Sequence, residues 1–477
     1  MWSNKRNWSC TSRGCGGGPL EKLPLELIGE ILSRVRVAGF VIRASLTCKK
    51  WREAYLKHLH TLSFASLDDY RVYTQLPTSE LEMLITKTIL QSPGLRTLWI
   101  KMNMEHEFSA VSVLGWLMFA RENLSELFYM VRTSPSINVL NVCGRRKLET
   151  LSLCHYTIRG VELNFQRLPS LTSLSLRCVR SSVEDLNRLL LSLPKLESLV
   201  LCSPILGDSD EVDLPEITVK LCGLTLKTLI IELLDGREFL LEKCDIGFLR
   251  VYECNFGSFQ VTGSKSLRHF KFSSTHSQLL EIEEGDNLEI LEIIDSCISQ
   301  SNLFPMKIQA PKLKTFRIWE FDNKPSMSFG IAVGGSRLVV DLKQVAVCSP
   351  QLSHLALFCP YALCDIEYNF DGSSSLGNVG VLEMACYVLD GFWEWAEKVL
   401  THCPNVRKLI IRMIIEKYKK LLPPPHFATA TTARNERLRK YHCVDLAKRT
   451  SLVAEMMRKY QHLQVEFSYV YRCDFQA

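Results

Sequence analysis

Cysteine, histidine and carboxylate side chains are the groups that could bind a metal ion or carry out catalysis, but their spacing predicts neither. The chain has 477 residues, of which 18 are cysteine. Cys10–Cys15 and Cys359–Cys364 each enclose four residues, and neither has a second pair nearby to complete a zinc site. His402 has no carboxylate at a useful spacing, and no nucleophile, base and orienting group are recognisable. We therefore expect no catalytic residue, no metal site and no cofactor.

Six aromatic and basic side chains in the middle of the chain indicate binding rather than catalysis. They occupy alternate positions of short stretches in which apolar and variable residues alternate, so each group should share one face of a strand. Aromatic residues and arginine dominate the energetics of protein interfaces. We expect the following residues to contact a substrate: Phe248, Arg250, Tyr252, Lys271, Arg317 and Trp319.

The stretches that carry these side chains belong to a repeated phrase. Six copies match the pattern Pro-x-[Leu/Val]-x-x-[Leu/Phe]-x-[Leu/Ile], the first at Pro93 and the last at Pro404. Other copies lack the proline, and between Leu148 and Leu313 successive copies start 20 to 30 residues apart. An ordinary leucine-rich α/β domain would not repeat one phrase in this way, so the sequence predicts stacked repeats.

Each repeat predicts one strand and one return segment. The alternation at the end of the phrase is typical of a short strand that buries one face. Between copies lie segments such as Ser182–Ser192, which predicts a helix with its leucines on one side. This is the pattern of leucine-rich repeats, so we expect an α/β fold, a curved solenoid with parallel strands on its concave face. We assign residues 63–477 to it, with about 12 irregular repeats and a C-terminal helix and strand cap at about 433–475.

The segment before the repeats, Leu23–Leu59, predicts a separate block of short helices. Pro24 fits the first turn of a helix, and apolar residues follow at helical spacing as far as Val35. A second apolar series, from Val41 to Tyr55, again forms a helical stripe. A block of this size is near the limit at which a core is stable alone, so we expect it to dock on the repeats or on a partner.

This block resembles the F-box. The resemblance rests on Leu-Pro-x-Glu-Leu-Ile-x-x-Ile-Leu-Ser from Leu23 and on Ile-Arg-Ala-Ser-Leu-x-Cys-Lys-x-Trp from Ile42. With leucine-rich repeats behind the block, the chain looks like a plant F-box/LRR-repeat protein from about Leu20 to the C-terminus. We assign residues 20–62 to the F-box and residues 1–19 to a disordered N-terminal extension.

The resemblance implies a function. It implies a non-catalytic, substrate-recognition subunit of a Skp–cullin–F-box ubiquitin ligase. In such a ligase the F-box docks on a Skp-type adaptor and through it on a cullin, while the repeats bind a target protein for ubiquitination. By this analogy the residues that contact the adaptor or shape the second helix are Leu23, Pro24, Leu27, Ile28, Ile31, Leu32, Leu46, Cys48 and Trp51.

Two other functions remain open from the sequence. The chain could be an interaction scaffold in which the helical block only stabilises the repeats, or a small-molecule co-receptor, since some plant F-box/LRR proteins bind hormones. The basic segment Ala433–Leu463 suits RNA contact or nuclear import as well as a terminal cap, which we favour.

Composition excludes several further classes. A hydrophobic content of 47% with 23% charged residues excludes wholesale disorder, and a net charge of +6 over this length does not indicate nucleic acid. The longest apolar run, Ala110–Ala120, is far shorter than the roughly 18 residues of a membrane-spanning helix. The first twenty residues contain no apolar signal segment. We therefore expect reduced cysteines, no membrane partner and a location in the nucleus, the cytoplasm or both.

Overall fold

The computed structural model describes residues 22–65, 76–143, 146–162, 168–207, 217–298, 306–319, 338–359, 366–369, 375–387, 391–415, 451, 454–455 and 457–471. The expected N-terminal extension and most of the expected C-terminal helix lie outside these residues. The chain divides into two compact units, the first made of Met1–Tyr156, Asn164–Leu174 and Leu193–Lys195, and the second of the remainder. Across the described stretches, no helix is both long and apolar enough to cross a membrane.

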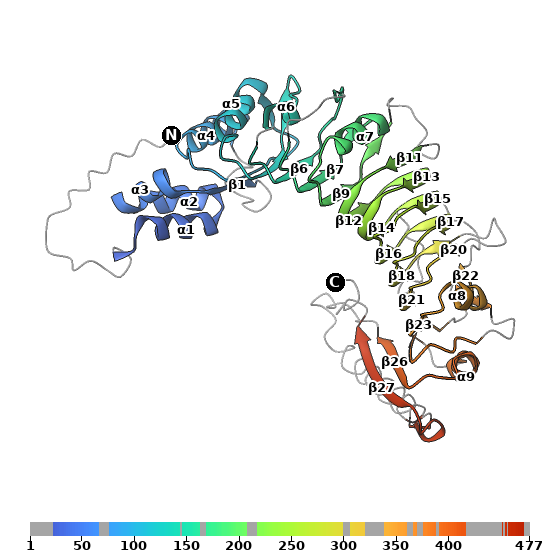
Figure 1. Ribbon diagram of the computed structural model, residues 1–477. Helices are drawn as coiled ribbons and strands as arrows, with labels where there is room; N and C mark the ends of the chain where they lie inside the picture. Colours follow the sequence, from blue (N-terminus) through green and yellow to red (C-terminus); the bar gives the residue numbers. More distant parts are fainter. Residues whose placement is uncertain are drawn as a thin grey trace, which may run out of the picture. The chain divides into compact units, whose positions relative to one another are not determined.

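The first unit begins with three helices, α1 (Leu25–Val35), α2 (Ala38–Ser45) and α3 (Lys49–His58), shown in blue in Figure 1. Helix α1 packs on α3 and buries Ile28 and Leu32 completely. Gly29 of α1 faces α3, and a Cβ atom at this position would be 2.4 Å from the Cβ of His58. The absence of a side chain at Gly29 therefore lets the two helices approach closely.

The second apolar series of this block is divided between α2 and α3 instead of forming one helical stripe. Helix α2 ends at Ser45, and Thr47 closes the turn by donating hydrogen bonds from its amide and hydroxyl to the Ala44 carbonyl oxygen, 3.1 and 2.7 Å long. Cys48 is extended and precedes α3. Because of this turn, Cys48 is exposed while Tyr55, farther along α3, is buried.

The rest of the first unit alternates short strands with helices. Strands β1, β2, β4 and β6 pair in parallel and bury alternate residues, such as Leu98 and Ile100 of β2. The elements in chain order are β1 (Thr61–Ala65), α4 (Thr78–Leu90), β2 (Thr97–Lys101), β3 (Glu107–Ser109), α5 (Ala110–Ala120), β4 (Glu126–Met130), β5 (Arg132–Ser134), α6 (Val139–Cys143) and β6 (Thr150–Cys154).

The chain continues with further strands and three helices. The helix predicted at Ser182–Ser192 is confirmed as α7, and the Ser182 hydroxyl caps it by accepting the Asp185 amide at 3.0 Å. The elements are β7 (Ser173–Arg177), β8 (Arg180–Ser181), α7 (Val183–Leu191), β9 (Ser198–Cys202), β10 (Ile205–Leu206), β11 (Thr218–Cys222), β12 (Thr225–Glu232), β13 (Asp235–Glu242), β14 (Asp245–Tyr252), β15 (Asn255–Thr262), β16 (His269–Ser273), β17 (His276–Ile282), β18 (Ile290–Ile294), β19 (Cys297–Ile298), β20 (Met306–Ile308), β21 (Thr315–Trp319), β22 (Leu338–Asp341), α8 (Leu342–Cys348), β23 (His354–Phe358), β24 (Ile366–Asn369), β25 (Val381–Cys386), α9 (Phe392–His402), β26 (Lys408–Ile415) and β27 (Gln464–Tyr471).

One long parallel sheet, here called the main sheet, runs through the repeats. Its fifteen strands follow the order β1-β2-β4-β6-β7-β9-β12-β14-β16-β18-β21-β23-β25-β26-β27. Within the second unit, α7, α8 and α9 lie along one side of this sheet (Figure 1). The helical block followed by parallel repeat strands confirms the predicted leucine-rich-repeat fold. The strand expected from Leu463 is β27, which pairs with β26.

Between residues 217 and 308 the return segments are strands, where the sequence predicted helices. They form a second parallel sheet, β11-β13-β15-β17-β19, with β20 also paired to β17. Phenylalanines fill the space between the two sheets: Phe259 of β15 lies 5.8 Å from both Phe270 and Phe272 of β16, measured between ring centroids. Two sheets that pack face to face need large side chains to fill the space between them, and aromatic rings meet this need.

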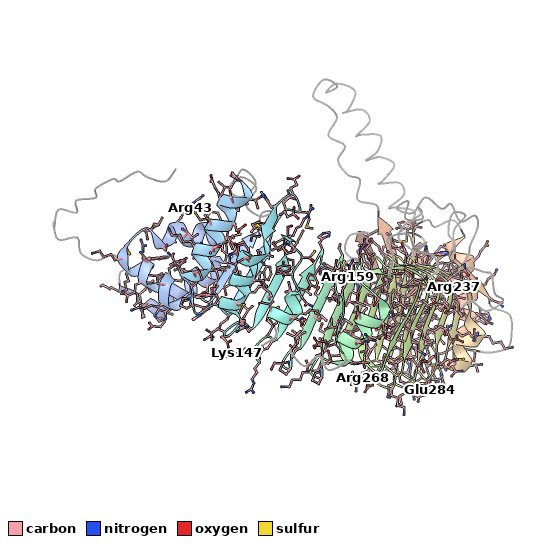
Figure 2. The ribbon with its side chains drawn as sticks, turned by 90° about the horizontal axis from the view of Figure 1, so that it is seen from above. Arg43, Lys147, Arg159, Arg237, Arg268 and Glu284 are labelled. Atoms are coloured by element: carbon pink, nitrogen blue, oxygen red, sulfur yellow. The ribbon has the colours of Figure 1, made fainter. Side chains whose placement is uncertain are left out.

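Some charged side chains of the second unit lie at its edge. Figure 2 shows Arg268 and Glu284 there, and both side chains are exposed. The interior of the repeats is apolar. Every second residue of a strand, such as Leu249 and Val251 of β14, is buried there.

Candidate interaction surfaces

Helix α1 carries a row of exposed apolar side chains, here called the α1 row. Leu27, Ile31 and Val35 are 51%, 38% and 41% exposed. They are four residues apart, so they lie one above another on the same face of the helix. An apolar row of this kind on a small helical block is typical of a surface that a partner covers.

Two residues assigned to adaptor contact from the sequence face the interior instead. Ile28 and Leu32 have no exposed surface, because α1 packs on α3 through this face. They hold the helical block together and cannot contact a partner without opening it. Of the other α1 assignments, Leu23 is half-buried and Pro24 is exposed.

The turn between α2 and α3 adds further exposed groups. Leu46 is 66% exposed and Cys48 is also exposed, whereas Trp51 is half-buried on α3. Phe40 on α2 is 49% exposed, and the Arg43 guanidinium lies 5.8 Å from its ring centroid. The accessible apolar groups of the block therefore come mainly from α1, α2 and the turn, and α3 adds Leu56, which is 38% exposed.

The second surface is the open face of the main sheet, defined by the side chains that alternate with the buried strand residues. On β14 the open face presents Phe248, Arg250 and Tyr252, and on β16 it presents Lys271, as the sequence predicted. Arg250 and Lys271 are direct partners in the parallel ladder. The Arg250 guanidinium lies 5.3 Å from the Tyr252 ring centroid.

The structure separates Trp319 from this group. Trp319 is only 3% exposed, so it is a core residue and not an accessible contact. Its neighbour Arg317 lies over the ring, with the guanidinium carbon 5.4 Å from the centroid. The alternation of residues along β21 correctly predicted that Trp319 lies on the open face of the sheet. Neighbouring groups cover Trp319, however, and exclude it from solvent.

Arg317 lies within a network of charges on the open face. It forms ion pairs with Glu292 of β18 and with Glu383 of β25, the latter at 3.8 Å. Arg317 reaches Glu383 across β23, where the residue at this level of the ladder is Ala356. The small alanine side chain leaves room for this contact.

Glu383 is the centre of the network and was not identified from the sequence. It is 2% exposed and accepts hydrogen bonds from Arg412 of β26 and from His354, whose Nε2 is 3.1 Å away. Glu292 is similarly buried and pairs with His269 at 3.3 Å. The sequence could have indicated both residues, because each is a carboxylate between the two apolar strand residues of the repeated phrase, at the position that faces outward.

Both carboxylates are held ionised. Burial by itself would raise the pKa of Glu383, but hydrogen bonds from His354 and Arg412 and the arginine charges outweigh it and lower the pKa below its ordinary value of 4.5. The pKa of Glu292 is also lowered, since the His269 hydrogen bond and the Arg317 charge exceed the opposing effect of burial. The network is therefore a set of internally neutralised charges.

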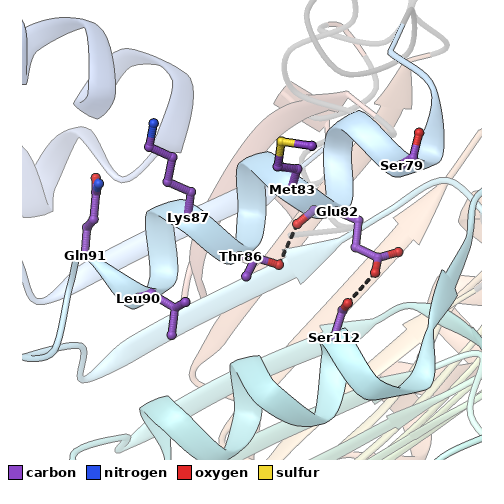
Figure 3. A pocket seen from close by; sticks show the side chains of 8 residues that line it. All are labelled: Ser79, Glu82, Met83, Thr86, Lys87, Leu90, Gln91 and Ser112. Atoms are coloured by element: carbon purple, nitrogen blue, oxygen red, sulfur yellow. Dashed lines mark hydrogen bonds between the residues drawn. The ribbon is translucent and has the colours of Figure 1, made fainter.

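A hollow of about 620 Å³ lies beside α4 (Figure 3). Met83 and Leu90 of α4 line it, and Glu82 accepts a hydrogen bond from Ser112 of α5. In the second unit a hollow beside α8 is only about 20 Å³ in volume. Neither hollow includes the open-face residues predicted to bind a substrate.

Metal and thiol chemistry has little support in the structure. The described residues contain no group of three or more histidine, cysteine or acidic side chains placed to hold a metal ion. The cysteines whose positions are described are all free thiols. Burial raises the pKa of the Cys143 and Cys254 thiols to about 12, which keeps them protonated and unreactive at neutral pH.

Comparison with known proteins identifies the family of this chain. Residues 20–54 match the family model of the F-box domain, which covers α1 and α2 and the first part of α3. Over 456 residues the chain is 38% identical to an F-box/LRR-repeat protein of Arabidopsis thaliana, an alignment that covers 94% of this chain and 100% of the relative. The N-terminal helices and the parallel repeat strands are the two parts that this name describes. The chain therefore belongs to the plant F-box/LRR-repeat proteins.

Proposed function

We propose that this protein is a substrate-recognition subunit of a Skp–cullin–F-box ubiquitin ligase. Its F-box, assigned to residues 20–62, docks on a Skp-type adaptor, which connects it to a cullin. The repeat domain, assigned to residues 63–477, binds a target protein. The polypeptide supplies no chemical group to the reaction, since it raises the effective concentration of the target near the activated ubiquitin.

The observation that carries this proposal is the α1 row together with its family assignment. Leu27, Ile31 and Val35 are exposed on a helix whose other face is fully packed. Exposure of three aligned apolar side chains is unfavourable in water. Because they are only 38–51% exposed, their burial by a partner would gain about 0.6–1.5 kcal/mol each. Family membership favours a Skp-type adaptor as the partner that covers them, with Leu23, Pro24 and Leu46 as further contacts and Trp51 supporting the block.

Copurification tests the adaptor contact. The full chain is coexpressed with a Skp-type adaptor, and the double variant Leu27→Asp/Ile31→Asp is compared with Met83→Asp. Met83 is a matched control, because it is a 70% exposed apolar residue on helix α4 of the same unit. We expect the double variant to weaken adaptor binding by about 100-fold or more, and the control to bind like the unmodified chain.

Two results would count against the proposal. If the unmodified chain does not capture the adaptor, the protein is an interaction scaffold and its helices serve only as a cap. If Leu27→Asp/Ile31→Asp binds as well as the unmodified chain, the α1 row is not the contact. Circular dichroism of each variant separates loss of binding from loss of folding.

The target surface comprises the accessible residues of β14 and β16. Phe248, Arg250, Tyr252 and Lys271 remain candidates for target contact, because they share the open face and are partly exposed. Arg317 is neutralised by two carboxylates and is not proposed as a primary contact. We propose a protein target rather than a small-molecule ligand, because aromatic side chains and arginine dominate the energetics of protein interfaces. We also propose that the protein is located in the nucleus, the cytoplasm or both.

A further inference from the structure

The cations of the open face differ in whether they are neutralised. Arg317 and Arg412 pair with Glu383, and Lys408 pairs with Glu466 at 2.7 Å. By contrast, no carboxylate among the described residues forms an ion pair with Arg250 or Lys271. Two cations that form no ion pair with a described residue therefore lie next to each other where β14 meets β16.

Arg250 and Lys271 are held next to each other by the fold. They are opposite residues of adjacent parallel strands, so their Cα atoms are about 4.8 Å apart. Tyr252 packs against the Arg250 guanidinium, and the Arg250 Nε atom is buried without a hydrogen-bond partner among the described residues. Because Arg250 is partly exposed, the accessible part of this positioned guanidinium, and not its buried Nε atom, can bind an anion.

Aromatic side chains border this pair of cations. Phe248 lies edge-on to His269, with ring centroids 4.9 Å apart, two ladder positions from Arg250 and Lys271 and on the same face. Tyr252 lies on the other side of Arg250 in the same strand. An occupant of this place meets two positive charges between two apolar ring surfaces.

The neighbouring carboxylates limit how much negative charge fits here. Glu292 is next to Lys271 in the ladder, and its pKa is lowered by His269, Arg317 and Lys271 together. Glu232 lies opposite Tyr252 on β12 and Glu253 follows Tyr252 in the chain, and both carboxylates raise the pKa of the Tyr252 hydroxyl. These nearby negative charges disfavour a dianion such as phosphate and favour a single carboxylate.

We infer that Arg250 and Lys271 bind a carboxylate side chain of the target protein, so that the recognised segment is acidic and carries an apolar neighbour that packs on Tyr252 or Phe248. This inference rests on the proposed function, because it specifies the chemistry of the target that the open face holds. The two cations form the charged centre of the site, and the rings shield the ion pair from solvent.

Fluorescence anisotropy with labelled peptides tests the inference. Three peptides of one length present Glu, Gln or phosphoserine at the same single position next to a leucine, and are titrated with the full chain bound to its adaptor. We expect the Gln peptide to bind about tenfold or more weakly than the Glu peptide. Binding of the Glu peptide should also weaken when the salt concentration rises, because the contact is charged and partly exposed.

Variants of the chain locate the site. Arg250→Gln/Lys271→Gln should weaken binding of the Glu peptide by about tenfold or more. Lys314→Gln is the matched control, since it removes a positive charge that pairs with Glu289 at 3.1 Å away from these two cations, and should change affinity less than about twofold. Arg250→Glu/Lys271→Glu should transfer binding to a peptide with lysine in place of glutamate.

The outcomes are separable from those of the proposed function. Equal binding of the Glu and Gln peptides, equal effects of Arg250→Gln/Lys271→Gln and Lys314→Gln, or much tighter binding of the phosphoserine peptide would each overturn the inference. Arg250→Gln/Lys271→Gln should still capture the adaptor. If the free chain binds the Glu peptide at this site but never captures the adaptor, the ligase function fails while the acidic-segment site stands.

Discussion

Replacement of Glu383 by glutamine is the sharpest test of the charge network on the open face. Glu383 is 2% exposed and lies between Arg317, Arg412 and His354. Glutamine has nearly the same shape, so Glu383→Gln removes the negative charge with little change in packing. Arg412 then loses its ion-pair partner, whereas Arg317 keeps its ion pair with Glu292.

The expected magnitude follows from burial. Loss of one partner of a buried ion pair typically costs about 3–5 kcal/mol, because the remaining charge is desolvated and unpaired. The side chains of Arg317 and Arg412 are 29% and 28% exposed, so water compensates part of this loss. We expect Glu383→Gln to lower the free energy of unfolding by about 2–3 kcal/mol. For a domain of 150–250 residues this corresponds to a decrease in Tm of about 4–12 °C. The second unit is larger than such a domain, so we expect a decrease near the lower end of this range.

Thermal unfolding of the full chain by scanning calorimetry measures the effect, with Glu466→Gln as the control. Glu466 belongs to the same ladder level two strands away and pairs with Lys408, but its side chain is 48% exposed. The control should leave Tm unchanged. If both substitutions lower Tm equally, or if Glu383→Gln has no effect, then burial does not determine the importance of these carboxylates and the reasoning is refuted.

The remaining predictions concern pH and packing. The folded-state pKa values of Glu292 and Glu383 are lowered, so their stabilisation is present above the ordinary pKa of about 4.5 and is lost as the pH falls through the folded-state values. The Tm difference between the unmodified chain and Glu383→Gln should therefore narrow below about pH 4.5, and a constant difference would contradict this. Gly257→Ala should lower the free energy of unfolding by about 1–3 kcal/mol, because a Cβ there would lie 2.5 Å from the Arg237 carbonyl oxygen. Urea unfolding measures the change, and Gly380→Ala, where no atom lies within 4 Å of the added Cβ, should have a much smaller effect.

The sequence predicted much of the architecture. The repeated phrase predicted parallel strands and Ser182–Ser192 predicted α7, while the resemblance of the segment from Leu23 indicated an F-box, and each is confirmed. The first two predictions succeed because they depend on which residues are apolar and how far apart they lie. Both quantities are local properties of the chain.

The return strands of the second sheet could not be predicted in the same way. A short apolar segment is compatible with a strand or with one turn of helix, and the choice depends on what covers the neighbouring repeat. Here the facing layer is built from phenylalanines such as Phe259 and Phe270, which pack between the sheets. The layer of side chains that faces the return segments therefore determined that these segments are strands.

For the interaction surfaces, the sequence determined which side chains face which side, and the tertiary structure decided which of them are available. Tyr252 and Trp319 occupy the same position of their repeats, but only Trp319 is covered. Arg250 and Arg317 also occupy the same position of their repeats. Of the two, Arg317 forms ion pairs with carboxylates, which belong to strands that are far apart in sequence. Availability and charge depend on these distant neighbours, because exposure and ion pairing are properties of the assembled sheet and not of any single repeat.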